Sequence, residues 1–387
     1  MDVLRGVAMI LMALDHTRSF FSPASAVPEN LATTTGALFF TRFITHFCAP
    51  LFFLLAGTGA YLSLARGKSL SEVSRFLCIR GLWLVFLGLV VASYGWTFMF
   101  PVLSSGVLWA LGWSMVAMAI LIRMPLPALG VFGTATILAH NLLDHVRPAV
   151  FGKFAPLWLL LHGYGGFWIV PGKLPFHVLW SLIPWLGVMA AGYCLGAILQ
   201  RNDWRKIVFM IGGVATLAFF VLRFLHLYGN GDATPSVFSA GPWQLQQTVT
   251  LTVVSFFNTV KYPASMQFLL MTLGPSLMLL AWLGNIKTDN WAARAVEVFG
   301  RVPLFYYILH IYLIHIFAVY TALLYKQKVA WLMYGAFKLN EAPAGYGHGL
   351  AFIYGMWLTV VLVMFPLCWS FMRVKQRHPE CWWLRYL

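Results

Sequence analysis

The sequence has few charged residues: Asp, Glu, Lys and Arg together occupy only 10% of its 387 positions. A soluble domain carries about 25% charged residues, which keep its surface hydrated. Here 60% of the residues are hydrophobic and 17% are aromatic. Because so little charge cannot hydrate so much apolar surface, the composition excludes a water-soluble globular protein and predicts an integral membrane protein.

Cysteine and acidic residues are also scarce. The five cysteines, Cys48, Cys78, Cys194, Cys368 and Cys381, show no metal-ligand spacing, so we expect neither a disulfide framework nor a metal site. The 26 basic residues outnumber the 11 acidic ones, which gives a net charge of +15. Since the basic residues lie at the ends of apolar segments and not in one patch, they indicate membrane topology rather than nucleic-acid binding.

The hydrophobic segments predict an all-α, polytopic fold that forms one transmembrane domain over residues 1–387. A crossing helix needs about 20 apolar residues. The predicted helices are 3–21, 43–64, 80–100, 104–122, 126–143, 176–199, 206–227, 262–284, 301–325 and 350–372. Residues 248–260 are apolar but short, so we predict a re-entrant segment; if they cross, the helices number eleven. Residues 155–172 are too apolar for a solvated loop, and we expect them to fold back into the protein.

With ten crossings, the basic groups of the loops fall on one side of the membrane. These residues are Arg66, Lys68, Arg75, Arg80, Arg123, Arg201, Arg205, Lys206, Lys287, Arg294, Arg373, Lys375 and Arg377. The positive-inside rule makes this side cytoplasmic and places both termini there. Membrane lipids are then partners of the protein, and association into a homo-oligomer is left open.

The first predicted helix, DVLRGVAMILMALDHTRSFF, is unusually polar. A charged side chain at the centre of a membrane helix costs about 2.5–3.5 kcal/mol, whereas each aliphatic residue returns only about 0.3–0.6 kcal/mol. We therefore expect the charged side of this helix to face protein or a polar cavity and not lipid.

The polar residues of this helix form one stripe, because they recur at steps of three and four. The stripe consists of Asp2, Arg5, Met9, Met12 and His16. Arg5 and His16 are about 20° apart around the helix and about 16 Å apart along it. We expect Arg5 near the cytoplasmic mouth and His16 near the opposite mouth. For Asp2 and Arg5, anchoring at the lipid headgroups is an equally good interpretation.

His16 suits group transfer because histidine exchanges protons near neutral pH. It could deprotonate a hydroxyl or an amine, or could itself accept an acyl group. Asp15 is a candidate to orient the ring, although adjacent residues on a helix do not face each other.

Several motifs resemble those of known membrane enzymes. The pattern D-x-x-R-G-x-A, with ten residues between Arg5 and His16, resembles the first-helix motif of type-three membrane acyltransferases. The segments TRFITHFCAPLFFLLAGTGAYLS, NTVKYPASMQFLLMTLGP and GRVPLFYYILHIYLIH more closely resemble the bacterial branch of the heparan-α-glucosaminide N-acetyltransferase catalytic-domain family. The resemblance covers most of the chain.

This resemblance implies a multi-helix protein of the bacterial inner membrane. Acetyl-CoA or another acyl-CoA would be the donor on the cytoplasmic side, and a glycan or glycolipid would be the acceptor on the other side. His16 would be the catalytic histidine and Arg5 the arginine beside the donor. In the animal enzymes, however, the catalytic histidine lies in the loop after the first helix. Residues 22–42 contain no histidine, so either His16 has this role or the reaction differs.

Other polar residues are further candidates for the site. Those expected to line the acceptor side are Arg18, Arg42, His46, Asn258, Lys261, Tyr262, His310 and His315. Those expected to hold CoA phosphates beside Arg5 are Asp2, Arg294 and Arg301. Ordinary roles compete with each assignment: interfacial anchoring for Arg42 and His46, snorkelling for Lys261 and core packing for His310.

The sequence as a whole predicts an acyl-CoA-dependent O- or N-acyltransferase with no metal. A secondary transporter is the alternative, because intramembrane Asp, His and Arg also form proton relays and substrate sites. The two halves of the sequence show no matching broken helices, which speaks against a transporter built from repeats.

Overall fold

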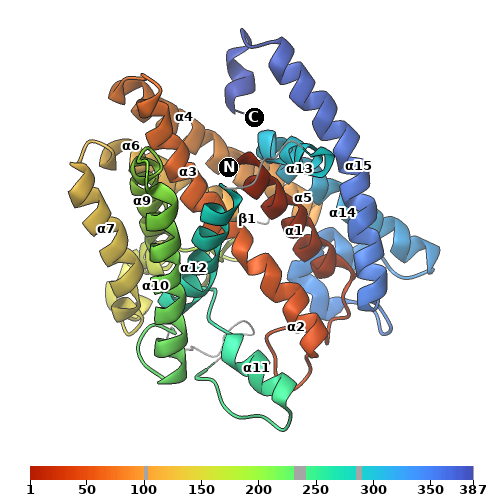
Figure 1. The fold of residues 1–387 in the computed structure, drawn as a ribbon. Coiled ribbons are helices and arrows are strands. Elements are labelled where there is room, and N and C mark those ends of the chain that lie inside the picture. Colours follow the sequence, from red (N-terminus) through yellow and green to blue (C-terminus); the bar gives the residue numbers. More distant parts are fainter. Residues whose placement is uncertain (100–102, 231–240, 285–289, 387) are drawn as a thin grey trace.

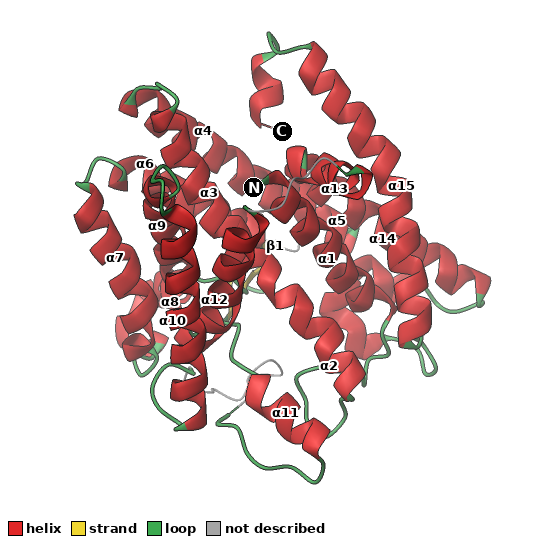
Figure 2. Cartoon of the chain, in the orientation of Figure 1, coloured by secondary structure: helices red, strands yellow, loops and turns green. Residues whose placement is uncertain are grey.

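The computed structural model describes residues 1–99, 103–230, 241–284 and 290–386, which form a mostly helical bundle (Figures 1 and 2). The longer helices are α1 (Asp2–Phe21), α3 (Cys48–Ala65), α4 (Leu70–Leu87), α6 (Val107–Leu121), α7 (Leu126–Ala139), α9 (Leu182–Ile198), α10 (Trp204–Phe224), α12 (Met266–Leu283), α13 (Trp291–Arg301), α14 (Pro303–Leu324) and α15 (Leu350–Arg377). The short helices are α2 (Gly36–Phe43), α5 (Ser93–Thr97), α8 (Ala155–His162) and α11 (Val249–Phe257).

Further short turns are the 3-10 segments η1 (Ile44–Phe47), η3 (His140–Leu143), η4 (Pro148–Phe154), η5 (Ala330–Glu341) and η6 (Trp382–Tyr386), and the π turn η2 (Gly88–Ala92). Several of these turns join neighbouring helices into longer rods. Helices α2 and α3 are continuous through η1, and α4 continues through η2 into α5.

Seven helical segments of the described chain are long and apolar enough to cross a membrane. They are Gly36–Ala65, Leu70–Thr97, Leu126–Leu143, Trp204–Phe224, Met266–Leu283, Pro303–Leu324 and Leu350–Arg377. Helices α6 and α9 are apolar but have only 15 and 17 residues. Helix α1 has 20 residues and carries four charges. Each predicted span thus lies on a helix, and the ten crossings stay a prediction. Residue 100, the predicted end of one helix, and Lys287 lie outside the described residues.

Helix α1 lies inside the bundle, between α3 on one side and α13, α14 and α15 on the other (Figure 1). Its contact with α13 depends on two glycines. A Cβ atom on Gly6 would lie 2.0 Å from the Val296 carbonyl oxygen, and one on Gly300 would lie 1.9 Å from the Asp2 carbonyl oxygen. The two backbones therefore touch directly, and α1 packs its surface against protein on several sides, as expected.

A small sheet is the main departure from the predicted all-α fold. Strand β3 (Leu174–Val178) pairs in parallel with β1 (Leu103–Ser105) and antiparallel with β2 (Gly165–Val170), in the order β1-β3-β2. The helix predicted over 176–199 begins only at Leu182, because the residues before it pair as β3. Apolar composition alone did not distinguish these strands from helix.

Residues 155–172 were predicted to fold back into the protein. This prediction was wrong for strand β2, residues Gly165–Val170. Five of the six positions of β2 are exposed, including Trp168 at 55%. Strand β2 lies at an edge of the sheet, so only one of its sides is paired.

The apolar stretch 248–260 contains only the nine-residue helix α11. Nine residues rise about 14 Å, whereas the hydrocarbon core of a bilayer is about 30 Å thick. An eleventh crossing is therefore excluded for this stretch. Helix α11 packs against α2 at the end of the bundle opposite the chain termini (Figure 1). A re-entrant position in the membrane stays a prediction.

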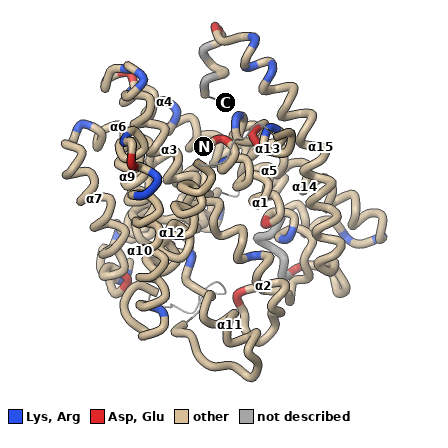
Figure 3. The backbone as a smooth tube through the Cα atoms, in the orientation of Figure 1, with Lys and Arg blue, Asp and Glu red and all other residues tan. Residues whose placement is uncertain are grey.

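Lysine and arginine are most frequent at the end of the bundle where both termini lie (Figure 3). This end carries the turns α3–α4, α6–α7 and α9–α10 and the last turns of α15. The predicted one-sided distribution of basic loop residues is thus visible in the fold.

We expect Gly6→Ala to destabilise the protein, because its methyl group would collide with the backbone of α13. Overpacking of this kind costs about 1–3 kcal/mol. The melting temperature of the purified protein in detergent should fall. Gly59→Ala in α3, where a Cβ meets nothing within 4 Å, is the matched control and should melt like the parent. Equal melting of the two variants would contradict the packing described here.

Candidate functional site

A pair of histidines lies where α1 meets α14. Nδ1 of His16 is 2.7 Å from Nε2 of His310, and the two ring planes are within 14° of parallel with centroids 4.9 Å apart. His310 is completely buried, and its Nδ1 is 2.8 Å from the carbonyl oxygen of Tyr306. His16 is partly exposed. The structure thus brings together two residues that are 294 positions apart.

The hydrogen bonds of this pair determine its proton positions. A carbonyl oxygen only accepts, so Nδ1 of His310 must donate to Tyr306. Burial disfavours a charged ring, and in a neutral His310 the other nitrogen, Nε2, is an acceptor. His16 therefore donates from Nδ1 to His310. This leaves Nε2 of His16 with a free lone pair, which is the form that a general base requires.

Aromatic residues surround His16. Trp96 lies edge-on to its ring with centroids 4.7 Å apart, and Tyr307 does so at 6.1 Å. Trp96 comes from α5, directly after the π turn η2. Such turns are rare and are frequent at functional sites. Gly95 allows α5 to approach α14, because a Cβ there would lie 2.8 Å from the Tyr312 ring.

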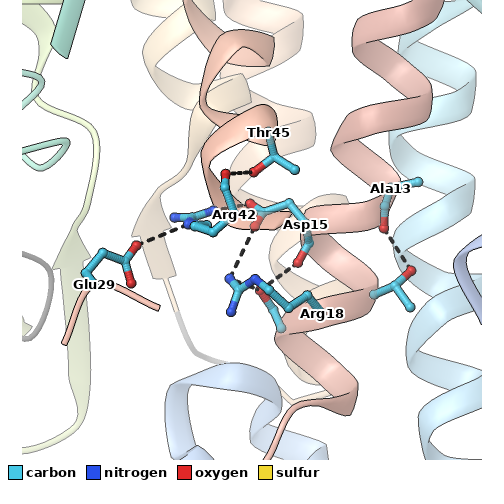
Figure 4. Close-up of polar contacts among 8 residues, drawn as sticks. Ala13, Asp15, Arg18, Glu29, Arg42 and Thr45 are labelled. Atoms are coloured by element: carbon cyan, nitrogen blue, oxygen red, sulfur yellow. Dashed lines mark hydrogen bonds and ion pairs between the residues drawn. The ribbon is translucent and has the colours of Figure 1, made fainter. Parts of the chain in front are cut away.

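Asp15 belongs to an ion-pair chain and does not orient His16. One carboxylate oxygen pairs with Arg42 of α2, and the other lies 3.2 Å from Arg18 (Figure 4). Arg42 also binds Glu29 at 3.1 Å. The expected role of Asp15 as the orienting carboxylate is therefore taken by His310. Asp15 pairs with the two arginines and not with His16. Arg18 lies one turn further along α1, and Arg42 reaches the carboxylate from α2.

The other acceptor-side candidates lie around the same chain. Asn258 donates to the backbone oxygen of Glu29 at 2.8 Å. Tyr262 forms a hydrogen bond with Arg42, and Lys261 acts electrostatically on His16, Arg42 and His46. His315 lies elsewhere: its two nitrogens are 2.9 Å and 2.8 Å from the carbonyl oxygens of Gly95 and Leu332, and a neutral ring donates to one of them. Those contacts are typical of a packing histidine.

Cations cluster at the other end of α1. Arg5 binds Asp2 at 2.9 Å and the Gly300 carbonyl oxygen at 3.3 Å. Arg80 of α4 and Lys375 of α15 are near enough to repel Arg5 and each other. Three like charges drawn together by three different helices favour an anion between them. In the sequence, Arg80 and Lys375 indicate only membrane topology, so this cluster was not predicted.

The remaining donor-side candidates are less suitable. Arg301 pairs with Glu297 of its own helix at 2.7 Å, and Arg294 is exposed on the same helix. A cavity of about 510 Å³ lies beside the start of α1, and its lining includes both Asp2 and Glu297. The same lining contains the basic side chain of Arg66. In the described parts of the chain, no three His, Cys, Asp or Glu side chains gather as metal ligands.

Fold and site together define a multi-pass helical membrane protein with a histidine pair at one end of its first helix and clustered cations at the other. Residues 1–228 match the family described as Heparan-alpha-glucosaminide N-acetyltransferase, catalytic. The match covers more than half of the chain, so the protein belongs to this family, and the resemblance seen in the sequence is confirmed. A comparison with curated protein sequences found no match. The matched range contains His16 but ends before His310 and Lys261.

We expect Asp15→Asn to destabilise the fold, because it leaves two guanidinium groups without their shared carboxylate. The Arg42 side chain is only 6% exposed. Removing one partner of a buried pair costs about 3–5 kcal/mol. Thermal melting in detergent measures the loss. The control is Asp203→Asn, whose partner Arg201 is 61% exposed, and it should melt like the parent. Unchanged melting of Asp15→Asn would show that the ion-pair chain is not structural.

Proposed function

We propose that this membrane protein transfers an acetyl or similar acyl group from acyl-CoA to a glycan or glycolipid, with His16 as the general base. Family membership supports a transferase. The observation that carries the proposal is the hydrogen-bond order from Tyr306 through His310 to His16, which leaves Nε2 of His16 able to accept a proton. O-acylation and N-acylation need the same base.

In this mechanism, Nε2 of His16 takes the proton of the acceptor hydroxyl or amine as its oxygen or nitrogen attacks the thioester carbon. The new ester or amide bond forms, the C–S bond breaks, and the sulfur leaves as thiolate. His16 then returns the proton to that thiolate, so the pair ends as it began. His310 fixes the ring by its hydrogen bond, which is the role that a carboxylate has in other catalytic histidines.

The donor would span the length of α1. Arg5, Arg80 and Lys375 would hold the CoA phosphates at one mouth, where they supply positive charge from three helices. His16 lies eleven residues further along α1, about 16 Å away. An extended carrier arm would therefore present its thioester to the imidazole, while the acceptor enters from the opposite side.

We also propose that the protein lies in a bacterial inner membrane with both termini in the cytoplasm. The gathering of Lys and Arg at the end that carries both termini supports this orientation (Figure 3). It places the clustered cations on the side where acyl-CoA is made and the histidine pair toward the other side.

His16→Gln should lower kcat for acyl transfer by a factor of about 100–10,000, because an amide cannot accept the proton of the acceptor. Release of free CoA from radiolabelled acetyl-CoA, with a panel of sugar acceptors, measures it. His378→Gln is the control, since His378 is exposed and pairs with Glu380. Full activity of His16→Gln would remove His16 from the mechanism. Absence of turnover by the parent with every acceptor would favour a transporter.

Lys375→Ala should raise KM for acetyl-CoA by about 10–100-fold, because a charge-assisted contact to phosphate is worth about 1.5–3 kcal/mol. KM for acetyl-pantetheine, which lacks the nucleotide phosphates, should not change. Arg201→Ala is the control, because its guanidinium is exposed and pairs with Asp203. If both donors were affected equally, the cation cluster would not be the phosphate site.

A further inference from the structure

Lys261 is a buried cation that the proposed transfer does not use. The residue is only 7% exposed, and it lies in the connection between α11 and α12. Within the described residues, its ammonium group forms no ion pair. It lies instead over the rings of Trp180 at 5.7 Å and Tyr262 at 5.3 Å. A snorkelling lysine would extend its charge into water, so this interpretation does not fit the burial.

His46 is a second unusual group beside it. Both ring nitrogens are buried, and neither has a hydrogen-bond partner among the described residues. The ring contacts Phe43 and Phe268, which offer no acceptor. Buried polar groups are normally satisfied, and an imidazole without any partner is costly. The N–H of His46 is therefore able to donate to a bound group.

The charges around these two residues do not balance. Asp15 and Glu29 supply two negative charges, whereas Arg18, Arg42 and Lys261 supply three positive ones. The two carboxylates are already bonded to the arginines (Figure 4). Lys261 is thus the uncompensated cation, and its charge acts on both His16 and His46. An anion at this place would restore neutrality close to the transfer base.

We propose that Lys261 and His46 form an anion-binding subsite that holds an acidic group of the acyl acceptor, a carboxylate, sulfate or phosphate, so that the hydroxyl or amine to be acylated lies at His16. This inference rests on the proposed acyl transfer. The ammonium and the imidazole N–H both donate to the acidic group, while the rings of Trp180 and Tyr262 hold the ammonium in place. The donor phosphates bind at the far end of α1, so the two anionic partners do not compete.

The charge of this subsite depends on pH. Burial and the neighbouring charge of Arg42 lower the pKa of Lys261 to about 7, against the opposing effects of Asp15 and Glu29. The other titratable groups near it are Cys48, His16, His46 and Tyr262. Lys261 is therefore charged below about pH 7 and becomes neutral above it. KM for an acidic acceptor should rise as the pH increases from 6 to 8, relative to KM for its neutral counterpart.

The test compares matched acceptors, glucosamine with its 6-sulfate and 6-phosphate and methyl glucoside with methyl glucuronide, using the full chain in detergent. The parent should prefer the acidic member of at least one pair. Lys261→Met should raise KM for that member by about 10–100-fold and leave KM for the neutral member and for acetyl-CoA unchanged. Lys261→Arg should keep the preference but lose its pH dependence, because arginine stays charged. Lys153→Met, at an exposed lysine, is the control.

Two results would overturn the inference. The first is that the parent shows no preference for any acidic acceptor. The second is that Lys261→Met lowers kcat equally for acidic and neutral acceptors, a result that would assign Lys261 to the transfer step itself. A binding measurement separates this inference from the proposed function. The preferred acidic sugar, or each acidic sugar of the panel if none is acylated, should raise the melting temperature of the parent but not of Lys261→Met. If the melting temperature rises for the parent alone but no acyl transfer is detected, the subsite is retained and the proposed enzyme activity is rejected. If the melting temperatures of the parent and of Lys261→Met rise equally, the subsite is rejected.

Discussion

The cost of charge in an apolar bundle is the constraint on which this structure depends. Asp15 lies in a helix that lipid cannot surround, and its carboxylate is shared by two arginines, one of them from α2. Through Arg42 the same interaction reaches Glu29 in the loop that follows α1. One buried acid therefore fixes the positions of a helix, a loop and the helix that follows, and it does so beside the proposed reacting centre.

The histidine pair shows how a membrane protein can orient a base without adding charge. A carboxylate beside His16 would have needed its own compensation in this surrounding. His310 gives the same directional hydrogen bond from a neutral ring, and its own orientation comes from a backbone carbonyl that α14 supplies. A neutral hydrogen-bond partner suits this site, because the charge of the neighbouring Asp15 is already paired with Arg18 and Arg42.

The sequence predicted the helices and the family well, and the contacts of the site poorly. Each of the ten predicted segments contains a helix, because apolar runs are a strong local signal, whereas the amphipathic helix α13 was not predicted. Helical spacing placed Arg5 and His16 on one helix, but no local rule pairs His16 with a residue of α14. Lys375 and Arg80 were visible only as loop charges, since their meeting depends on how α4 and α15 pack. The strands were missed because short apolar strands and helices look alike in composition.

The π turn η2 changes the rotation of α5 relative to α4. Widening one turn of a helix adds a residue without adding a full rotation, and one residue of an α-helix corresponds to about 100°. The segment beyond Ala92 is thereby rotated as a unit relative to the helix before it. In a regular helix with the same sequence, Trp96 would be turned by about 100° relative to the helix before it. The contact between Trp96 and His16 thus depends on the rotation that the π turn introduces about one turn before Trp96.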